Sequence, residues 1–429
     1  MSYMAVFATA AETPGLFATM SAMWAVGLVV GGPIGAAFAE NSSATWRWAF
    51  YLNLPLVGLG LVIAFLCLPS HSLAPAGTSL LQRLKGIDPL GILFNAAAPV
   101  LFSLAATFSG PIWAWDSAAS IVTWVILGLV LIAWAVQQVF CIFTTEEERA
   151  FPVHILARYR LIPIWVASGC AGASYAVTLY YTPLFFAFAR GHDALQQTVR
   201  LLPFILVFIV VVLLTGGLLP VVKVYKPVYC LAGLFTLVGA TAMTVTLRTD
   251  VSESLVMGLE ALIGVGLGMH FQHGFGISNV INRDNARDRV DSTVVCNMLQ
   301  MGSIAGILAV AGCVFQNEGY NVLKKAVVSA DGSTPYSEEE IREALAGVSS
   351  AVWQSRDPEV LRKGIDAVTE VISDEFYIVM AAGILCMLCS AVMKWEKLDY
   401  RRPAAATVQE KDQSTASAQH SIGADNAST

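Results

Sequence analysis

Charged residues are scarce in this sequence: they make up 13% of 429 residues, whereas a soluble domain carries roughly 25%. This scarcity excludes an ordinary water-soluble fold. No Lys or Arg precedes Arg47, so the basic leader of a cleavable signal peptide is missing too. Metal-ligand clusters, a nucleophile elbow and a phosphate-binding glycine loop are also missing. We therefore expect no enzyme activity, no cofactor and no metal, and a net charge of −6 offers nucleic acid no basic surface.

Long apolar runs fill the rest of the chain, and the mean hydropathy is +0.64. A helix needs ~20 residues to cross the hydrocarbon core of a bilayer. Lipid offers no partner to open backbone groups, so such runs should be helices. The sequence predicts an all-α, polytopic membrane helix bundle whose function is to move something across a bilayer. Ten runs qualify: residues 19–39, 48–68, 88–109, 119–143, 162–188, 199–222, 227–247, 254–275, 292–315 and 375–395.

The distribution of Lys and Arg predicts the orientation. Fourteen of them lie in alternate loops at residues 69–87, 144–161, 223–226, 276–291 and 394–402, against four in the short loops of the other set. The positive-inside rule places the first set in the cytoplasm. Residues 317–374 then form an external loop, in which Ser337 and Glu340 predict a capped helix. We expect the tail, residues 396–429, to be disordered and cytoplasmic.

Two neighbouring motifs stand out near the N-terminus. The first predicted span is rich in small residues, which allow close helix approach, and its proline removes a backbone donor. The next motif reads as an interfacial aromatic and arginine anchor, with a proline placed to kink the second span. The residues concerned are Gly27, Gly31, Gly32, Pro33 and Gly35 in the first motif, and Trp46, Arg47, Trp48, Asn53 and Pro55 in the second.

Together these motifs resemble the antiporter motif and the WRWxFYxNxP signature of the major facilitator superfamily. The resemblance is to its fourteen-span branch of drug:proton antiporters, and within it to fungal toxin efflux pumps. It covers residues ~17 to 395 and is supported by Ile87-Asp88-Pro89-Leu90-Gly91, by Tyr181-Thr182-Pro183-Leu184-Phe185-Phe186, by Val199-Arg200-Leu201-Leu202-Pro203 and by Gly264, Gly266 and Gly268. The resemblance implies a proton-coupled exporter of drugs or secondary-metabolite toxins in the plasma membrane, or in the vacuolar membrane.

The chain also departs from this family. Ten spans are predicted where the family has fourteen, and the first four, with their basic loop motif and embedded arginine, are not found. We expect an N-terminally truncated protein or a gene-model fragment, which would be inactive. The expected parts are an uncertain segment (1–18), a remnant of the N-terminal bundle (19–68), a linker pair of spans (69–143), a C-terminal six-span bundle (144–395) and the tail.

Candidate functional residues are the polar groups inside predicted spans, because an ionisable group there costs at least ~2.5 kcal/mol. Glu260 is the candidate for proton coupling, since a carboxyl group in an apolar setting favours its protonated form. A packing or interfacial role is the alternative. His270 and His273 lie three residues apart near the inner end of the same span, and Tyr181 and Phe185 are further candidates for a substrate cavity; these side chains could equally face lipid or the core.

Three functions remain open from the sequence. The first is proton-driven export of amphipathic small molecules, with a cavity near the midplane between two halves. The second is an inactive truncated product. The third, a membrane-embedded enzyme or sensor, has no motif to support it. The partners implied are a small-molecule substrate, protons and the lipid bilayer, and the oligomeric state is unknown.

Overall fold

The computed structural model describes residues 12–41, 43–67, 86–328, 335–347, 350–355 and 357–400. In this part of the chain every regular element is a helix. The long helices are α2 (Thr13–Glu40), α4 (Asn53–Cys67), α6 (Pro89–Phe108), α7 (Ala118–Phe140), α8 (Ile162–Arg190), α10 (Leu202–Val222), α11 (Lys226–Thr246), α12 (Glu253–His270), α14 (Ala286–Ala326) and α16 (Pro358–Val392). Short elements between them are α3 (Arg47–Tyr51), η1 (Val153–Ala157), α9 (Ala194–Arg200), α13 (His273–Ile281), α15 (Glu338–Ala346) and η2 (Ala351–Gln354).

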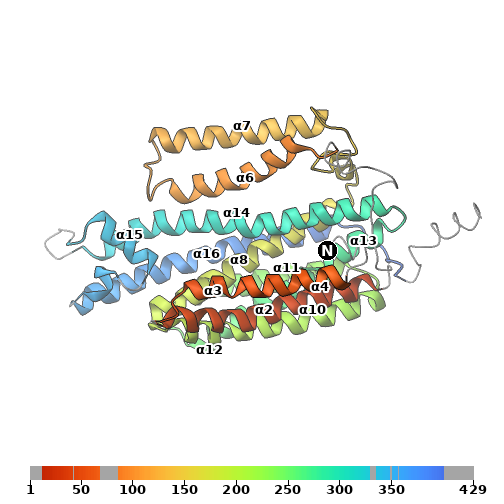
Figure 1. The fold of residues 1–429 in the computed structure, drawn as a ribbon. Helices are drawn as coiled ribbons and strands as arrows, with labels where there is room; N and C mark the ends of the chain where they lie inside the picture. The colour runs from red at the N-terminus through yellow and green to blue at the C-terminus, as the bar shows by residue number, and fades with distance from the viewer. Residues whose placement is uncertain are drawn as a thin grey trace, which may run out of the picture.

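The predicted helical membrane fold is confirmed. Ten helical segments are long and apolar enough to cross a bilayer, and each coincides with one of the ten predicted runs. The last two are longer than predicted. With 41 residues at 1.5 Å each, α14 is about 60 Å long, twice the ~30 Å of a hydrocarbon core. Much of the segment expected to be a loop at residues 317–374 therefore continues α14 and α16 beyond the bilayer (Figure 1).

Successive loops gather alternately at two opposite ends of the bundle (Figure 1). At one end Arg158, before α8, pairs with Asp288 in the first turn of α14. At the other end Arg200 donates to Glu253 over 2.6 Å, which joins α9 to the start of α12. The two ends correspond to the two sets of loops separated by charge counting. Which end faces the cytoplasm stays a prediction.

Helix α8 lies at the centre of the molecule, against α14, α16 and α12, and most of its residues are buried. Close packing around α12 depends on the predicted glycines. A Cβ on Gly264 would lie 2.9 Å from the Phe204 carbonyl of α10, and one on Gly266 would lie 2.7 Å from the Ala232 carbonyl of α11. Alternate glycines thus face different neighbours, which lets α12 approach both helices closely.

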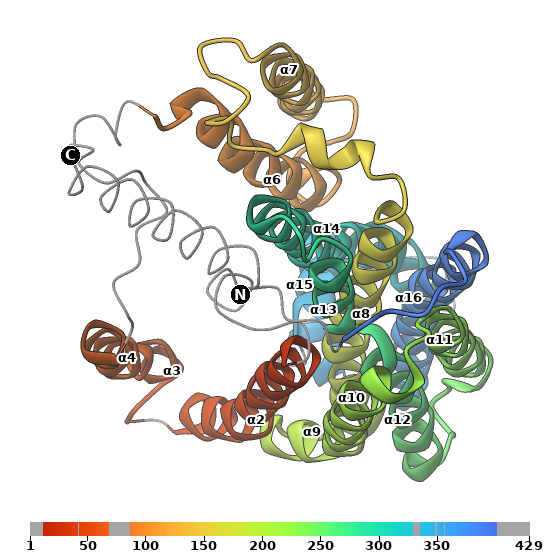
Figure 2. The same cartoon turned by 90° about the vertical axis from the view of Figure 1, so that its right-hand side faces the viewer.

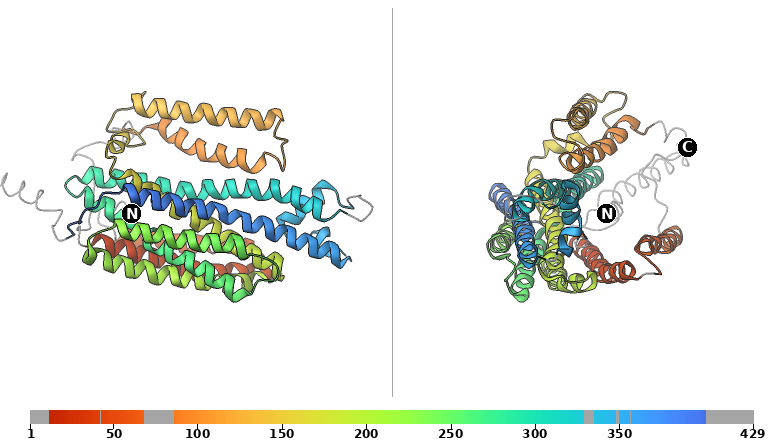
Figure 3. Two further views of the ribbon diagram at one scale, coloured as in Figure 1. Left: turned by 180° about the vertical axis from the view of Figure 1, so that it is seen from behind. Right: turned by 90° about the vertical axis from the view of Figure 1, so that its left-hand side faces the viewer.

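Helices α6 and α7 stand beside the main bundle and contact it through α14 (Figures 2 and 3). Their base is held by the buried carboxylate of Asp88, the N-cap of α6. It accepts from the Gly91 amide at 2.8 Å, from both Gln137 and Gln138, and from the Ala150 amide at 3.1 Å. Burial opposes ionisation, but these hydrogen bonds outweigh it and lower the pKa of Asp88.

Helices α3 and α4 lie away from the main bundle, and none of their residues is buried (Figure 2). The chain bends at Leu52, between the two helices. Pro55 lies in the first turn of α4, where its ring opposes a helical approach of the Tyr51 carbonyl. The predicted kink at the proline stays a prediction, although the helix is interrupted three residues before it, at Leu52.

The capped helix predicted within residues 317–374 is confirmed as α15, with Ser337 as its N-cap and a complete capping box with Glu340. The tail differs from expectation at its start. Residues 396–400, which we call the strap, are packed on the bundle instead of being disordered, and Tyr400 is buried. Residues 401–429 lie outside the described part. The strap contacts three loops: Glu396 pairs with Arg160, the Leu398 amide donates to the Lys223 carbonyl at 2.8 Å, and Arg283 donates to the Asp399 carbonyl at 3.0 Å.

Candidate functional site

The eighth predicted span is broken into α12 and α13 at Phe271 and Gln272. The Phe275 amide donates to the Gln272 carbonyl three residues back, so the Phe271 carbonyl loses its helical partner. Gln300 of α14 replaces that partner by donating its side-chain amide to the Phe271 carbonyl. Broken helices at membrane depth are tolerated where other groups satisfy the freed backbone, and they commonly line sites for substrates and ions.

Unpartnered polar atoms collect around this break. Both ring nitrogens of His273 are buried without a hydrogen-bond partner in the described part of the chain, and so are the side-chain oxygens of Gln272 and Gln300. Each of these residues is at most 2% exposed. Buried polar atoms are normally paired, so four free atoms at one break indicate a place where water or a ligand supplies the missing partners.

Aromatic side chains cover the same break from the side of α2. Trp24 donates to the Tyr175 hydroxyl at 3.2 Å, and its ring lies 6.1 Å from that of Phe271. Tyr175 and Phe271 are themselves 5.2 Å apart, and Phe208 of α10 meets Phe271 edge-on at 5.3 Å. Three helices and the break itself therefore contribute to one aromatic cluster, which can hold an apolar ring system next to the free polar atoms.

The two predicted histidines flank the break but face different neighbours. Nδ1 of His270 donates to the Gly266 carbonyl at 2.8 Å, and its ring lies edge-on to Tyr229 of α11. His273 begins α13 and interacts with the carbonyl groups of Gly268 and Val212, the latter on α10. Neither ring nitrogen of His273 reaches hydrogen-bonding geometry with these carbonyl groups, whereas Nδ1 of His270 is bonded, and this makes His273 the stronger candidate for ligand contact.

Glu260 lies ten residues before the end of α12, about 15 Å along the helix from the break. Its side chain is fully buried, and neither carboxylate oxygen has a hydrogen-bond partner among the described residues. The Phe204 amide, in the first turn of α10, is the polar group that acts on it. An unpaired carboxyl group in such a position is the kind of group that takes up and releases protons.

Tyr181 and Phe185 lie elsewhere. Both are fully buried in the C-terminal half of α8, where Tyr181 contacts Phe315 of α14 at 5.6 Å between ring centres and the Arg190 guanidinium lies over Phe185. Tyr181 also borders a cavity of about 480 Å³ between α6, α8, α14 and α15. The structure thus groups His270 and His273 but separates them from Tyr181 and Phe185.

The signature residues near the N-terminus occupy the α2–α4 segment. Gly32 packs closely against α9, because a Cβ at this position would lie 2.5 Å from the Thr198 side chain. Positions 27, 31 and 35 have open space beside them. Arg47 stacks on Trp46 at 4.7 Å, which matches the predicted aromatic and arginine anchor, and Asn53 bonds back to the Ala49 carbonyl across the bend.

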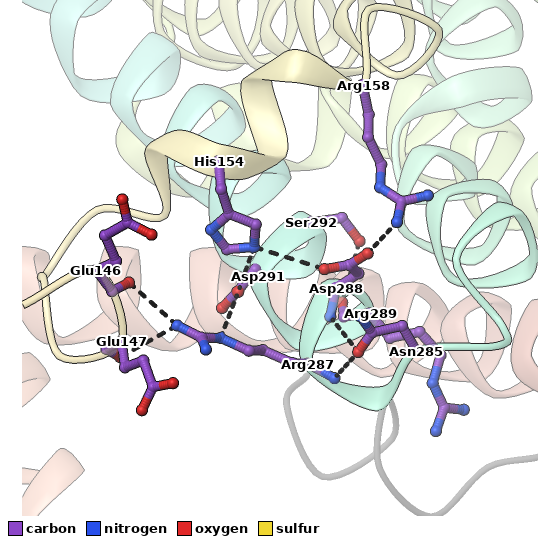
Figure 4. Close-up of polar contacts among 10 residues, drawn as sticks. All are labelled: Glu146, Glu147, His154, Arg158, Asn285, Arg287, Asp288, Arg289, Asp291 and Ser292. Atoms are coloured by element: carbon purple, nitrogen blue, oxygen red, sulfur yellow. Dashed lines mark hydrogen bonds and ion pairs between the residues drawn. The ribbon is translucent and has the colours of Figure 1, made fainter. Parts of the chain in front are cut away.

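A network of charged groups closes the end of the bundle near the start of α14 (Figure 4). Nε2 of His154 lies 3.5 Å from Asp288 and 3.3 Å from Asp291, and Arg158 also pairs with Asp288. Arg287 completes the network by donating to the carbonyl groups of the loop after α7, at residues 146 and 147. The network ties that loop to α14 and so fixes the position of η1.

These features are those of a helical transporter, and comparison with known proteins decides its family. A profile of the Major Facilitator Superfamily matches residues 1–310. The chain belongs to the Major Facilitator Superfamily. Its relatives include efflux pump patC of Aspergillus clavatus, 33% identical over 92% of this chain and 71% of the relative. Efflux pump alnA of Emericella nidulans is 31% identical over 95% of this chain and 72% of the relative.

A third relative, efflux pump DEP3 of Fusarium langsethiae, is 29% identical over 95% of this chain and 72% of the relative. The resemblance drawn from the sequence motifs is therefore confirmed, and this major facilitator chain is an integral membrane transport protein. Sequence reasoning named His270, His273 and Glu260 as candidates, but it did not consider Gln272 and Gln300, which the structure places at the break. Both glutamines interrupt apolar runs, and that interruption is the signal that could have drawn attention to them.

Proposed function

We propose that this transporter exports amphipathic small molecules, of the drug or secondary-metabolite toxin class, in exchange for protons. The observation that carries the proposal is the break between α12 and α13. There His273, Gln272 and Gln300 offer free polar atoms beneath the aromatic cluster of Trp24, Tyr175, Phe208 and Phe271. A molecule with an apolar ring system and one or two hydrogen-bonding groups fits both kinds of contact.

The relatives support the outward direction of transport. Three proteins that match more than nine-tenths of this chain carry the name efflux pump. We extend that direction to this chain and assign it to the plasma membrane, with the vacuolar membrane as the alternative. The loop charges favour a cytoplasmic tail.

We also propose that the chain is divided into the three membrane parts predicted from the sequence. Residues 19–68 belong to an N-terminal bundle, residues 69–143 form a linker pair, and residues 144–395 form a six-span bundle. The aromatic cluster joins α2 of the first part to α8, α10 and the break after α12 in the third. A substrate site between two parts of the molecule suits alternating access, in which one part rocks against the other.

Glu260 is the proposed proton carrier. It is buried against the first turn of α10 and has no cation paired with it among the described residues. Protonation removes its uncompensated charge, and deprotonation restores it, so the packing of α10 against α12 responds to the proton.

The test is efflux from vesicles reconstituted with the full chain under an imposed proton gradient, with a panel of apolar drugs. We expect gradient-driven efflux that a protonophore abolishes. Glu260→Gln keeps the shape of the side chain and should reduce efflux to the level of empty vesicles. Glu343→Gln, which neutralises an exposed carboxylate on α15, is the matched control and should transport normally.

The possible results separate the alternatives. Gradient-driven efflux by Glu260→Gln at the parental rate would remove Glu260 from the mechanism. No efflux by a folded, correctly inserted parent chain would favour the inactive alternative raised by the sequence.

A further inference from the structure

An acidic cavity lies at the end of the bundle that the loop charges predict to be outside. It has a volume of about 510 Å³ and lies between α16 and the loop that joins α11 to α12. Among its described lining residues are four acidic side chains and one basic side chain: Asp250, Asp366, Glu370, Asp374 and Arg248. The cavity shares no lining residue with the aromatic cluster, so the proposed transport site does not account for its charge.

The loop wall of the cavity is held in place from two sides. Arg190, at the end of α8, donates to the carbonyl groups of Thr249 and Val251. The Thr249 hydroxyl donates to Asp366 Oδ1 at 2.6 Å, which joins the loop to α16. Because these contacts fix both walls before a ligand arrives, binding in the cavity costs little ordering of the protein.

The acidic side chains of α16 form a row without a cation. Asp366, Glu370 and Asp374 follow one another at four-residue intervals, so they share one side of the helix, and all three are exposed. Arg248 lines the same cavity, but within the described part of the chain it forms no ion pair with them. Asp374 instead interacts with two like charges, Glu370 and Glu318 of α14. Such a row favours a ligand that carries several positive charges.

A buried polar group on the same helix also indicates a ligand. Thr369 lines the cavity between Asp366 and Glu370 and is 2% exposed, and its hydroxyl has no hydrogen-bond partner among the described residues. The hydroxyl groups of Thr241 and Thr246 in α11 donate to carbonyl groups of the preceding turn, as helical threonines commonly do. Buried hydroxyl groups are normally paired, so the free one at Thr369 is available to accept a hydrogen bond from a ligand in the cavity.

The spacing of the acids favours an elongated cation over a metal ion. A divalent metal ion needs its oxygen ligands within ~2.0–2.6 Å of one point, whereas successive acids of the row lie about 6 Å apart along the helix axis. Within the described residues no group of His, Cys, Asp and Glu could hold a metal ion. An aliphatic chain with ammonium groups at intervals of a few carbon atoms suits the row, because each ammonium group can donate to a different carboxylate.

We propose that the acidic cavity is an external binding site for an organic polycation of the polyamine class. Its ammonium groups pair with Asp366, Glu370 and Asp374, and one of them donates to the Thr369 hydroxyl. Asp250 belongs to the loop wall, so a bound polycation joins the loop to α16 and stabilises this end of the bundle. The site goes beyond the proposed export function and requires no proton coupling.

The test is the binding of spermidine to the purified full chain in a neutral detergent, measured by isothermal titration calorimetry at low ionic strength. Glu370→Gln combined with Asp374→Asn should weaken binding on the order of a hundredfold, because two charge-assisted hydrogen bonds are lost. Glu339→Gln combined with Glu343→Gln removes two exposed charges from α15, and this matched control should bind as the parent does. Thr369→Val keeps the shape of the side chain and should weaken binding about tenfold.

Arg248→Gln has an expected effect that misfolding cannot imitate. It removes the guanidinium that lines the cavity and repels a cationic ligand, so spermidine should bind several-fold more tightly. Spermidine should also raise the unfolding temperature of the parent chain but not that of the variant with Glu370→Gln and Asp374→Asn, since a ligand stabilises only a protein that binds it.

Three results would each overturn the site. They are an affinity for Mg²⁺ equal to that for spermidine, an equal loss of affinity in the two double variants, and weaker binding in Arg248→Gln. Unchanged binding in Thr369→Val would remove the hydroxyl from the site and leave the row of acids. The binding measurement uses no proton gradient, so its outcome is separate from that of the efflux experiment.

Discussion

At the scale of single residues, the packing around Gly91 leaves no space for a larger side chain. A Cβ there would lie 2.2 Å from Asp88 Oδ2 and 2.4 Å from the Gln138 amide nitrogen, inside the network that holds α6, α7 and the loop after α7 together. Gly91→Ala should therefore destabilise the protein by about 1–3 kcal/mol through overpacking. Thermal unfolding in detergent measures this.

Gly128→Ala in α7 is the matched control for Gly91→Ala. It has open space where the Cβ would be placed, so it should be neutral or stabilise the helix by about 0.5–1 kcal/mol. Equal unfolding temperatures for the two variants would show that the Asp88 network does not require a glycine.

Single residues also show which buried polar groups could be predicted from the sequence. Glu260 was singled out as a candidate because a charge inside an apolar run is conspicuous, and the structure buries it fully. Glu375, which is 1% exposed, was overlooked because hydropathy placed it at the end of a run, where an acid is ordinary. The partner of Gln300 could not be inferred at all, since the Phe271 carbonyl lies 29 residues away and is freed only by a local break.

At the scale of elements, the break between α12 and α13 depends on Gln300. Gln300→Leu would leave the buried Phe271 carbonyl without its donor and should cost about 1–3 kcal/mol in the free energy of unfolding. Gln316→Leu is a control on the same helix, because the described structure shows no hydrogen bond from that half-buried side chain. If both variants unfold at the same temperature, the break does not rely on α14.

Helix boundaries were predictable where the boundary of the helix coincides with the boundary of the apolar run. Helix α8 begins at the predicted residue and α11 begins one residue early. Hydropathy underestimated α14 and α16, because both continue as helices past the apolar region into polar sequence, where backbone hydrogen bonds and contacts with α15 take over. Hydropathy measures the preference of a residue for lipid, so it cannot predict that a helix continues into polar sequence.

At the scale of the whole molecule, topology follows from the grouping of loops at two ends. A reporter fused after Arg402 should read as cytoplasmic, and a tag inserted at residue 347 after α15 should be reached by antibody from outside intact cells. The asymmetry of fourteen basic residues against four is the reason. Accessibility of the C-terminal reporter from outside would refute the orientation.

The strap has a consequence for biogenesis. The strap contacts loops that are synthesised long before residue 396. The groups contacted are the Arg160 side chain, the Lys223 carbonyl and the Arg283 side chain. Chains are made from the N-terminus onward, so these contacts form only after α16 has been synthesised. A chain released before residue 396 lacks them, and the three earlier loops are therefore joined by the strap only in a chain that includes α16.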